Sequence, residues 1–273
     1  MVWGPEVFEA LRSIASPALD RIVKLLTDLG SENFYTAAVP IVYWCISKSM
    51  GFGLGVTAVI SGALNIALKD AFRVPRPYVL YPGLGAPDFL LNTGTGWSYP
   101  SGHAQSTATF WWYLAFSTRA IWAVWAAAIM TVVISFTRVY ATVHSPTDVM
   151  AGALIGAALA AVYVGAERGP QGRKLVSTGP LVTAAVALPA GVLALSSWLS
   201  GAELAQNLAP LMGFAAGTII GYRIERLHIG FREQAPIGIQ IAKALMGVAG
   251  IFAVRYGLKA VFPSGLAWTM IRY

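Results

Sequence analysis

Residues 120–138 read AIWAVWAAAIMTVVISFTR, a stretch in which Arg138 alone carries a charge. About 20 apolar residues in succession are enough for a helix to cross the hydrocarbon core of a bilayer. The whole chain has the same character, since 56% of its 273 residues are apolar and 11% are charged, against roughly a quarter charged in a soluble domain. The mean hydropathy is +0.63. These values exclude a soluble globular protein, and the nine Trp and eleven Tyr exclude a disordered chain.

Seven other apolar runs of similar length flank this stretch. With it they give eight predicted spans, at 33–48, 51–71, 102–118, 120–138, 146–165, 178–199, 206–222 and 236–258. We therefore expect an all-α fold, a polytopic membrane helix bundle of about eight transmembrane helices.

The chain ahead of the first span has a different pattern. Residues 5–29 carry apolar side chains at helical spacing among charged ones, which predicts an N-terminal amphipathic helix lying in the membrane interface and broken near Pro17. The first six residues lack the basic and apolar regions of a secretory signal, so we expect this segment to be retained.

The distribution of basic residues predicts the orientation in the membrane. The formal net charge of +7 does not indicate nucleic-acid binding here, because the basic residues fall between apolar runs and loop charge mostly sets topology. Eight spans place both termini on one side. The opposite face carries Lys48, Arg119, Arg168, Arg173, Lys174, Arg223, Arg226 and Arg232 in its connections. We expect that face, with the polar loops 166–176 and 223–235, to be cytoplasmic, and the loop 72–101 to be extracytoplasmic.

A first cluster of basic residues lies at the outer end of the second span. Pro75 and Pro77 disfavour helix at the residues before them, so the helix should end near Arg73 and hold Arg76 in an extended segment. Lys69 then projects from the last turn. Snorkelling explains an isolated Lys or Arg near a membrane surface, but it gives no reason for the prolines on both sides of Arg76.

A second cluster, Tyr99-Pro100-Ser101-Gly102-His103, opens the third span. Ser101 and Gly102 stand where an N-cap is expected, so free backbone N–H groups and the positive end of the helix face outward. Such a helix terminus attracts phosphate. The alternative is an ordinary cap followed by a histidine at the interface.

A third cluster lies between the fourth and fifth spans, from Arg138 to Asp148. Ser145-Pro146-Thr147-Asp148 matches a capping box with Pro at the first helical position, so Asp148 has a structural explanation. The same carboxylate is also placed to accept the Nδ1–H of His144, which would fix the tautomer and stabilise an imidazolium. Helix counting puts all three clusters at one membrane face. His228, the third histidine, is expected to be solvated in a cytoplasmic loop.

The charges of the three clusters indicate an anion rather than a metal. Two histidines and Asp148 form a known ligand combination, but Lys69, Arg76 and Arg138 converging on one pocket would repel a cation. Cys45 is the only cysteine, so no internal disulfide and no Cys-based metal site can form. Arginine forks, a lysine and helix N–H groups together suit a phosphate. We therefore expect no cofactor and no metal.

The same residues supply the groups that phosphoryl transfer needs. His144, oriented by Asp148, is placed to attack phosphorus through Nε2. His103 is placed to protonate the leaving oxygen and then to activate water against the phosphohistidine.

In order and spacing the three motifs closely resemble those of the type-2 phosphatidic acid phosphatase superfamily. They are Lys, six residues and Arg-Pro (Lys69 to Pro77), then Pro-Ser-Gly-His (Pro100 to His103), then Arg, five residues, His, three residues and Asp (Arg138 to Asp148). The family often has Ser before the third-motif Arg, where this chain has Thr137. The resemblance covers about residues 30–165 and implies metal-independent hydrolysis of a lipid phosphate. It also implies that Ser101 and Gly102 contact the phosphate.

The sequence thus predicts an integral membrane lipid phosphatase acting on a phosphomonoester or diphosphate lipid. The predicted catalytic residues are His144, His103 and Asp148, and the predicted phosphate-binding residues are Lys69, Arg76, Ser101, Gly102 and Arg138. Three segments are expected: 1–32 as the interfacial helix, 33–165 as the phosphatase core, and 166–273 as a C-terminal three-helix membrane extension that matches no recognised motif.

Two other functions fit some of these features. A lipid phosphotransferase would use the same phosphohistidine with another acceptor. A lipid transporter or flippase would explain the number of spans and the cations Lys243 and Arg255 in the last one, but transporters place their sites near mid-membrane between inverted repeats.

Small residues recur at four-residue spacing in two of the spans. The pairs are Gly152/Gly156 and Gly213/Gly217/Gly221, and such spacing lets helices approach closely. Packing inside one bundle is the favoured explanation, and a homodimer through these helix faces is the alternative. The expected partners are thus the membrane and a lipid phosphate, with no nucleic acid.

Overall fold

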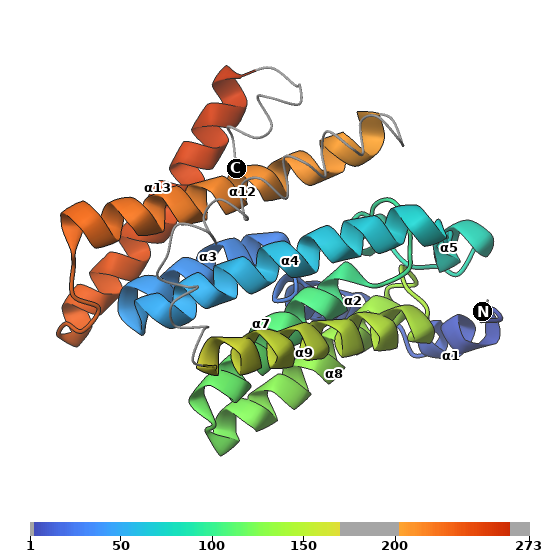
Figure 1. The fold of residues 1–273 in the computed structure, drawn as a ribbon. Coiled ribbons are helices and arrows are strands. Elements are labelled where there is room, and N and C mark those ends of the chain that lie inside the picture. Colours follow the sequence, from blue (N-terminus) through green and yellow to red (C-terminus); the bar gives the residue numbers. More distant parts are fainter. Residues whose placement is uncertain (1–2, 170–201, 263–273) are drawn as a thin grey trace. The chain divides into compact units, whose positions relative to one another are not determined.

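The computed structural model describes residues 3–169 and 202–262 of the chain (Figure 1). Every regular element in these ranges is a helix, which confirms the predicted all-α class for them. The helices are α1 (Glu6–Ser13), α2 (Pro17–Asp28), α3 (Glu32–Cys45), α4 (Lys48–Phe72), α5 (Pro77–Leu80), α6 (Asp88–Leu91), α7 (Gly102–Thr118), α8 (Ile121–Tyr140), α9 (Pro146–Arg168), α12 (Ala202–Ile224), the π-helix η1 (Glu225–Ile229) and α13 (Ile237–Val261).

Several of these helices are long and apolar enough to cross a membrane. In the described ranges there are four such segments, Lys48–Leu80, Ile121–Tyr140, Pro146–Arg168 and Ile237–Val261. The described ranges therefore contain four candidate membrane spans, and these coincide with four of the eight predicted ones.

The other predicted spans form helices of fewer than 18 residues, lie within a longer helix or fall outside the described residues. The runs at 33–48 and 102–118 form α3 and α7, which have 14 and 17 residues. At about 1.5 Å per residue, both helices are shorter than a hydrocarbon core of about 30 Å. The run at 206–222 lies within α12, and the run at 178–199 falls outside the described residues.

The chain groups into two compact units, which we describe separately. Of the described residues, the first contains 3–34 and 67–164, and the second contains 35–66, 165–169 and 202–262. All the residues of the three sequence motifs belong to the first unit.

The helices α7, α8 and α9 of the first unit lie alongside one another (Figure 1). Arg119, in a left-handed conformation with φ 56°, ends α7, and α8 turns back against it. A Cβ added at Gly152 would lie 2.5 Å from the carbonyl oxygen of Ser101, and one at Gly156 would lie 2.3 Å from that of Gln105. These two glycines therefore let α9 approach the first turns of α7, which is packing inside one bundle.

The amphipathic N-terminal segment forms two helices, with the predicted break at Pro17. The hydroxyl of Ser16 caps α2 by accepting from Leu19 N at 3.2 Å. The apolar face is not free, because α1 and α2 pack on α8 and bury Phe8 and Val23. Three large apolar side chains of this segment stay exposed, namely Ile14, Ile22 and Leu25.

In the second unit, polar contacts join α3 and α4 to the residues around η1. Lys48 Nζ lies 2.6 Å from Glu225 Oε1, and Glu225 Oε2 accepts from the Tyr43 hydroxyl at 3.0 Å. Lys243 donates to the carbonyls of Trp44 at 2.9 Å and Glu233 at 2.8 Å, so its ammonium is hydrogen-bonded inside the protein. Gly217 and Gly221 have open space where a Cβ would stand.

Candidate active site

The first motif leaves the helix where its prolines predict. α4 ends at Phe72, Arg73 has a positive φ of 46°, and Arg76 is extended with φ −77° and ψ 152°. α5 then begins at Pro77, the residue type favoured at a first helical position. Arg76 is therefore held between two helices by the backbone on both sides of it.

The guanidinium of Arg76 is buried, 4% exposed, and is bound on every nitrogen. Its hydrogen bonds run from Nε to Gly96 O (2.8 Å), from Nη1 to Val143 O (2.8 Å) and His144 Nε2 (3.1 Å), and from Nη2 to Thr95 O (2.5 Å) and Trp97 O (3.2 Å). A guanidinium has five N–H groups, so these contacts account for all of them. Arg76 thus ties the loop before α7 to the loop that carries His144.

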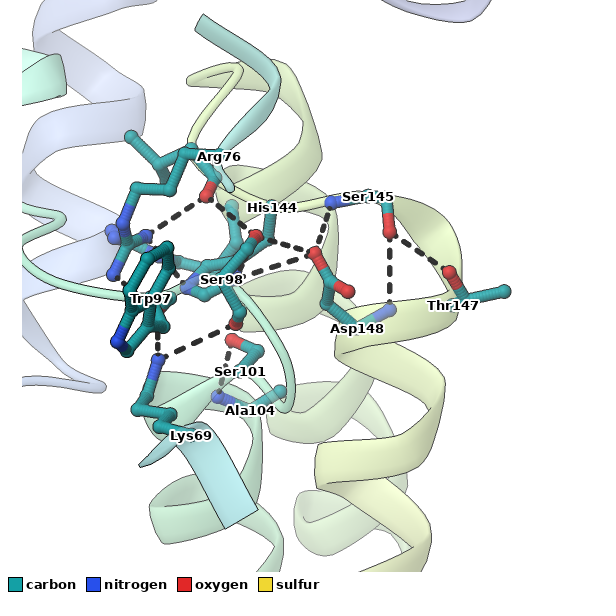
Figure 2. Close-up of polar contacts among 12 residues, drawn as sticks. Lys69, Arg76, Trp97, Ser98, Ser101, Ala104, His144, Ser145, Thr147 and Asp148 are labelled. Atoms are coloured by element: carbon teal, nitrogen blue, oxygen red, sulfur yellow. Dashed lines mark hydrogen bonds and ion pairs between the residues drawn. The ribbon is translucent and has the colours of Figure 1, made fainter. Parts of the chain in front are cut away.

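Lys69 reaches the same loop from the last turns of α4. Its ammonium donates to the carbonyl of Trp97 and to that of Ser98, the second at 3.4 Å. The carbonyl of Trp97 therefore accepts from both Lys69 and Arg76 (Figure 2). The structure brings the two cations of the first motif together at one short segment.

His144 lies between Arg76 on one side and a serine and an aspartate on the other (Figure 2). Its Nε2 faces Arg76, which can only donate, so Nε2 carries a lone pair and Nδ1 carries the proton. Nδ1 lies 3.3 Å from Ser98 Oγ and 3.7 Å from Asp148 Oδ2. The Ser98 hydroxyl in turn donates to Asp148 Oδ2 at 2.6 Å. A hydrogen-bonded path thus runs from His144 through Ser98 to the carboxylate.

Burial and positive charge hold His144 in its neutral form. The side chain is 2% exposed, and burial lowers its pKa well below the usual 6.5. The nearby charges of Arg76, Arg138 and Lys69 lower the pKa further. The imidazole is therefore a neutral base in a cationic environment at pH 7.

Asp148 also closes the capping box that its sequence context predicts. Its Oδ2 accepts from Ser145 N at 2.7 Å, and its own N–H donates to Ser145 Oγ at 3.3 Å. The carboxylate therefore both caps α9 and approaches His144, so the two explanations left open by the sequence are not exclusive. The direct separation of 3.7 Å from His144 is longer than a hydrogen bond.

Arg138, at the end of α8, is fully buried and held by two threonines. Nη1 donates to Thr27 Oγ1 at 2.7 Å and to Thr93 Oγ1 at 2.8 Å, and Nη2 donates to Thr93 O at 3.0 Å. In the described part of the chain, Nε has no hydrogen-bond partner. The hydroxyl of Thr137 lies 2.7 Å from Ile134 O and 3.1 Å from Thr27 Oγ1, so it supports this arrangement.

The second motif forms the N-terminus of α7. Ser101 is the N-cap, as predicted, and its hydroxyl accepts from Ala104 N at 3.4 Å. The N–H of Ser101 donates to Asp148 O at 2.9 Å, which ties this terminus to α9. The N–H groups of Gly102 and His103 have no backbone partner outside the helix in the described ranges and come too early for one inside it. His103 lies close to Gly30, where an added Cβ would stand 3.4 Å from its Cδ2.

The structure therefore brings every site residue predicted from the sequence into the first unit, close to one another. Three residues of this site were not identified from the sequence, namely Ser98, Thr27 and Thr93. Each is a hydroxyl residue without a distinctive motif, and its partner lies between 45 and 111 positions away in the chain. Only the position of Ser98, two residues before Pro100 of the second motif, offered a signal.

Comparison with known families and proteins supports the motif assignment. Residues 50–168 match the PAP2 superfamily, and residues 209–273 match the transmembrane extension of PAP2 superfamily phosphatases. The second match assigns a family to the C-terminal segment, for which the sequence motifs gave none.

Curated relatives with similar sequences are phosphatases. The chain is 28% identical over 178 residues to an undecaprenyl-diphosphatase of Sulfolobus acidocaldarius, covering 64% of this chain and 80% of that protein. It is 29% identical over 168 residues to a probable sphingosine-1-phosphate phosphatase of Dictyostelium discoideum, covering 53% of this chain and 38% of that protein. It is 29% identical over 169 residues to a rat glucose-6-phosphatase catalytic subunit, covering 52% of this chain and 46% of that protein. The chain thus spans less than half the length of the last two.

A solved structure shares the fold. The crystal structure of Aquifex aeolicus LpxE superposes with a TM-score of 0.51 at 22% identity, covering 60% of this chain and 96% of that one. Motifs, family models and fold agree, and the chain belongs to the PAP2 superfamily of phosphatases.

Proposed function

We propose that this protein is an integral membrane phosphatase that hydrolyses a lipid phosphomonoester or diphosphate at the extracytoplasmic leaflet. The reaction runs through a phosphohistidine on His144 and needs no metal. The observation that carries the proposal is the position of His144, whose neutral Nε2 faces the Arg76 guanidinium at 3.1 Å while Nδ1 faces Ser98 and Asp148.

The first step transfers the phosphoryl group to the enzyme. The lone pair of His144 Nε2 attacks phosphorus, and the bond from phosphorus to the leaving oxygen breaks. His103, which takes up a proton when the negative charge of the bound phosphate faces it, donates that proton to the leaving oxygen, so the lipid leaves as an alcohol or a monophosphate. The imidazole becomes cationic as the P–N bond forms, and the path through Ser98 to Asp148 stabilises that charge.

The second step returns the enzyme to its starting state. His103, now neutral, takes a proton from a water molecule that attacks phosphorus. The P–N bond breaks, inorganic phosphate forms, and the electron pair returns to His144 Nε2. No step requires a redox partner or a second substrate.

The cationic residues hold the phosphate oxygens in both steps. Arg76 exchanges its contact with Nε2 for a phosphate oxygen, which frees the nucleophile at the moment the substrate binds. Arg138 contributes its unpaired Nε–H, Lys69 contributes an ammonium, and Ser101 and Gly102 contribute the helix terminus. Because this site already concentrates positive charge, it suits an anion without a metal ion.

A lipid is the substrate class that the surroundings favour. Apolar side chains on the elements that carry the site stay exposed, including Phe72, Val79, Phe89 and Trp97. Two of the relatives are named for a prenyl diphosphate and for sphingosine phosphate. We place the site in the extracytoplasmic leaflet because basic connections such as those at Arg119 and Arg168 occupy the other end of α7, α8 and α9.

A substrate panel in detergent tests the activity. Purified protein is given lipid phosphomonoesters, prenyl diphosphates and glucose 6-phosphate in the presence of EDTA, and released phosphate is measured. We expect release from the lipids, and its loss in His144→Ala, His103→Ala and Arg76→Ala. Release that needs an added divalent cation would contradict metal independence. Transfer of labelled phosphate to an alcohol acceptor in preference to water would identify a phosphotransferase instead.

A thiol-labelling experiment tests the orientation. A single cysteine replaces the exposed Asp88, the first residue of α6 and three residues after Gly85, in a Cys45→Ser background. A membrane-impermeant reagent should label it from the extracytoplasmic side of sealed vesicles. Labelling from the cytoplasmic side alone would reverse the topology.

A further inference from the structure

Thr27 lies far from the three motifs in sequence but in contact with one of their residues. Its Oγ1 accepts a hydrogen bond from Arg138 Nη1 at 2.7 Å and lies 3.1 Å from the hydroxyl of Thr137. Thr27 and Arg138 are both fully buried. Thr27 stands near the end of α2, outside residues 50–168 that match the family domain.

The contacts of Arg138 divide its guanidinium into a bound edge and a free edge. Both N–H groups of Nη1 and one N–H group of Nη2 donate hydrogen bonds to Thr27 and Thr93. The two that remain are Nε–H and the second hydrogen of Nη2, which lie side by side in the planar group. Nε has no partner within the described ranges although it is buried. This remaining edge has the bidentate geometry with which arginine binds phosphate oxygens.

The helix that carries Thr27 is anchored along its length. Val23 packs in a cluster with Leu90, Tyr140 and Val143. Asp20 accepts from the Tyr140 hydroxyl at 2.8 Å and pairs with Arg12 at 2.7 Å. These contacts join α2 to the end of α8 that carries Arg138, so Thr27 is held in place independently of its own hydrogen bond.

The turn after α2 also passes close to the proposed general acid. A Cβ added at Gly30 would stand 2.7 Å from Ile134 Cγ2 and 3.4 Å from His103 Cδ2. The same short stretch, residues 27–30, therefore contacts Arg138 of the third motif and passes close to His103 of the second.

We propose that Thr27 is a positioning residue for phosphate binding. Its hydroxyl, together with that of Thr93, occupies one edge of the Arg138 guanidinium and presents the other edge to the substrate phosphate. The N-terminal helices α1 and α2 thus help to position a phosphate-binding residue. This inference rests on the proposed function, because it takes Arg138 to be a phosphate ligand.

Two substitutions separate the hydroxyl from the shape of the side chain. Thr27→Val keeps the branched shape but leaves an N–H of Arg138 against a methyl group, so the guanidinium has to turn toward another acceptor. Thr27→Ser keeps the hydroxyl and removes a methyl group. If Thr27 acts through packing, Thr27→Ser should be the more damaging substitution. If it acts through its hydroxyl, Thr27→Val should be the more damaging one.

Thr57 supplies a matched control. It is a buried threonine in α4, twelve residues before Lys69 in the sequence, whose hydroxyl donates to Gly53 O in its own helix at 2.7 Å. Thr57→Val therefore reports the effect of removing a buried hydroxyl as such.

The experiment measures KM and kcat on a lipid phosphate, together with the inhibition constant of inorganic phosphate. Loss of a hydrogen bond to a charged group corresponds to roughly tenfold or more. We expect Thr27→Val to raise KM and the phosphate inhibition constant about tenfold each, whereas Thr27→Ser and Thr57→Val stay near wild type. Folded protein is verified by monodispersity and thermal unfolding in detergent.

The outcomes distinguish this inference from the proposed function. If Thr27→Val and Thr57→Val have the same KM and the same phosphate inhibition constant while Arg138→Gln loses activity, only the role of Thr27 is overturned. Full activity in Arg138→Gln would overturn the phosphate-binding role of Arg138 and this inference with it. If Thr27→Val does not fold, a Thr27→Ser variant with raised inhibition constants for phosphate would contradict the proposal, and one with unchanged constants would support it.

Discussion

The hydroxyl of Ser98 lies between His144 and Asp148, 3.3 Å from Nδ1 of the imidazole and 2.6 Å from Oδ2 of the carboxylate. The two motif residues are themselves 3.7 Å apart, too far for a direct hydrogen bond. Ser98 is fully buried, so no water replaces it without a rearrangement. The orientation of the imidazole therefore depends on a side chain from the loop before α7.

Ser98→Ala should lower kcat about tenfold to a hundredfold, since it removes hydrogen bonds to a charged carboxylate and to the imidazole. KM should change little, because Ser98 does not face the phosphate in the proposed mechanism. Ser98→Thr keeps the hydroxyl and serves as the control. Unchanged kcat in Ser98→Ala would show that Asp148 orients His144 without the bridge.

The phosphoenzyme should be trapped in one histidine variant and absent in the other. His144→Ala removes the nucleophile and should reduce turnover by about 10³-fold or more. His103→Ala retains the nucleophile but lacks the group that activates water. With a ³²P-labelled substrate that has a good leaving group, alkaline-quenched His103→Ala should carry label and His144→Ala should not. Label retained in His144→Ala would place the nucleophile elsewhere.

The enzyme should keep its activity at mildly acidic pH. The pKa of His144 is held well below 6.5 by burial and by the cations around it, so its lone pair stays available as the pH falls through 6.5. The acid limb of kcat/KM assigned to His144 should therefore lie below pH 6.5. Profiles for two substrates with different phosphate pKa values separate the substrate's titration from the enzyme's. An acid limb at 6.5 that is independent of substrate would contradict the neutral, cation-surrounded imidazole.

The same shift predicts the pH dependence of stability. Between its folded-state pKa and 6.5, His144 binds more protons in the unfolded chain than in the folded one. The free energy of unfolding should therefore decrease as the pH falls below about 6.5. His144→Gln should remove this contribution in thermal unfolding experiments, whereas substitution of the exposed His228 should leave it.

Adding a methyl group at Gly152 should damage the site from the opposite helix. A Cβ there would lie 2.5 Å from the carbonyl oxygen of Ser101, so α9 would have to move away from α7 and stretch the bond from Ser101 N to Asp148 O. We expect Gly152→Ala to lose about 1–3 kcal/mol of stability and most of its activity. Gly217→Ala, which meets open space within α12, is the control and should unfold at the wild-type temperature or slightly above it, since Ala favours a helix more than Gly does.

The ion pair between Arg12 and Asp20 should stabilise the first unit. The Arg12 guanidinium lowers the pKa of Asp20 below 3.8, with help from the Tyr140 hydroxyl, so this contribution is present above pH 3.8 and is lost as the pH falls further. Asp20→Asn should lower the free energy of unfolding by about 1–3 kcal/mol at neutral pH. Asp28→Asn breaks a pair in which both side chains are at least one-third exposed and should have little effect.

The sequence predicted those features of the site that local chemistry determines. The end of α4 before Pro75, the cap at Ser101 and the capping box at Ser145 each depend on residues within four positions of one another. The ordered motifs predicted that His144, Arg76 and Arg138 would meet. Spacing and motif order also carried the family assignment.

What the sequence did not predict depends on contacts between distant residues. Thr27 and Thr93 lie 111 and 45 positions from Arg138, and a threonine pattern gives no sign of such a partner. The amphipathic N-terminal pattern equally fits a helix against lipid and a helix against protein, so the packing of α1 and α2 on α8 could not be chosen beforehand. The spans predicted at 33–48 and 102–118 stay unconfirmed, because α3 and α7 are shorter than the hydrocarbon core of a bilayer.

The saturated guanidinium of Arg76 has a consequence for turnover. Each of its N–H groups already has a protein acceptor. In the proposed mechanism a phosphate oxygen displaces one of these carbonyl or imidazole acceptors, so phosphate binding gains only the difference between the two hydrogen bonds. That difference is small for the departing inorganic phosphate and largest when negative charge peaks on the equatorial oxygens during transfer. The protein acceptors thereby compete with inorganic phosphate for the guanidinium, which favours rapid release of the product over product inhibition.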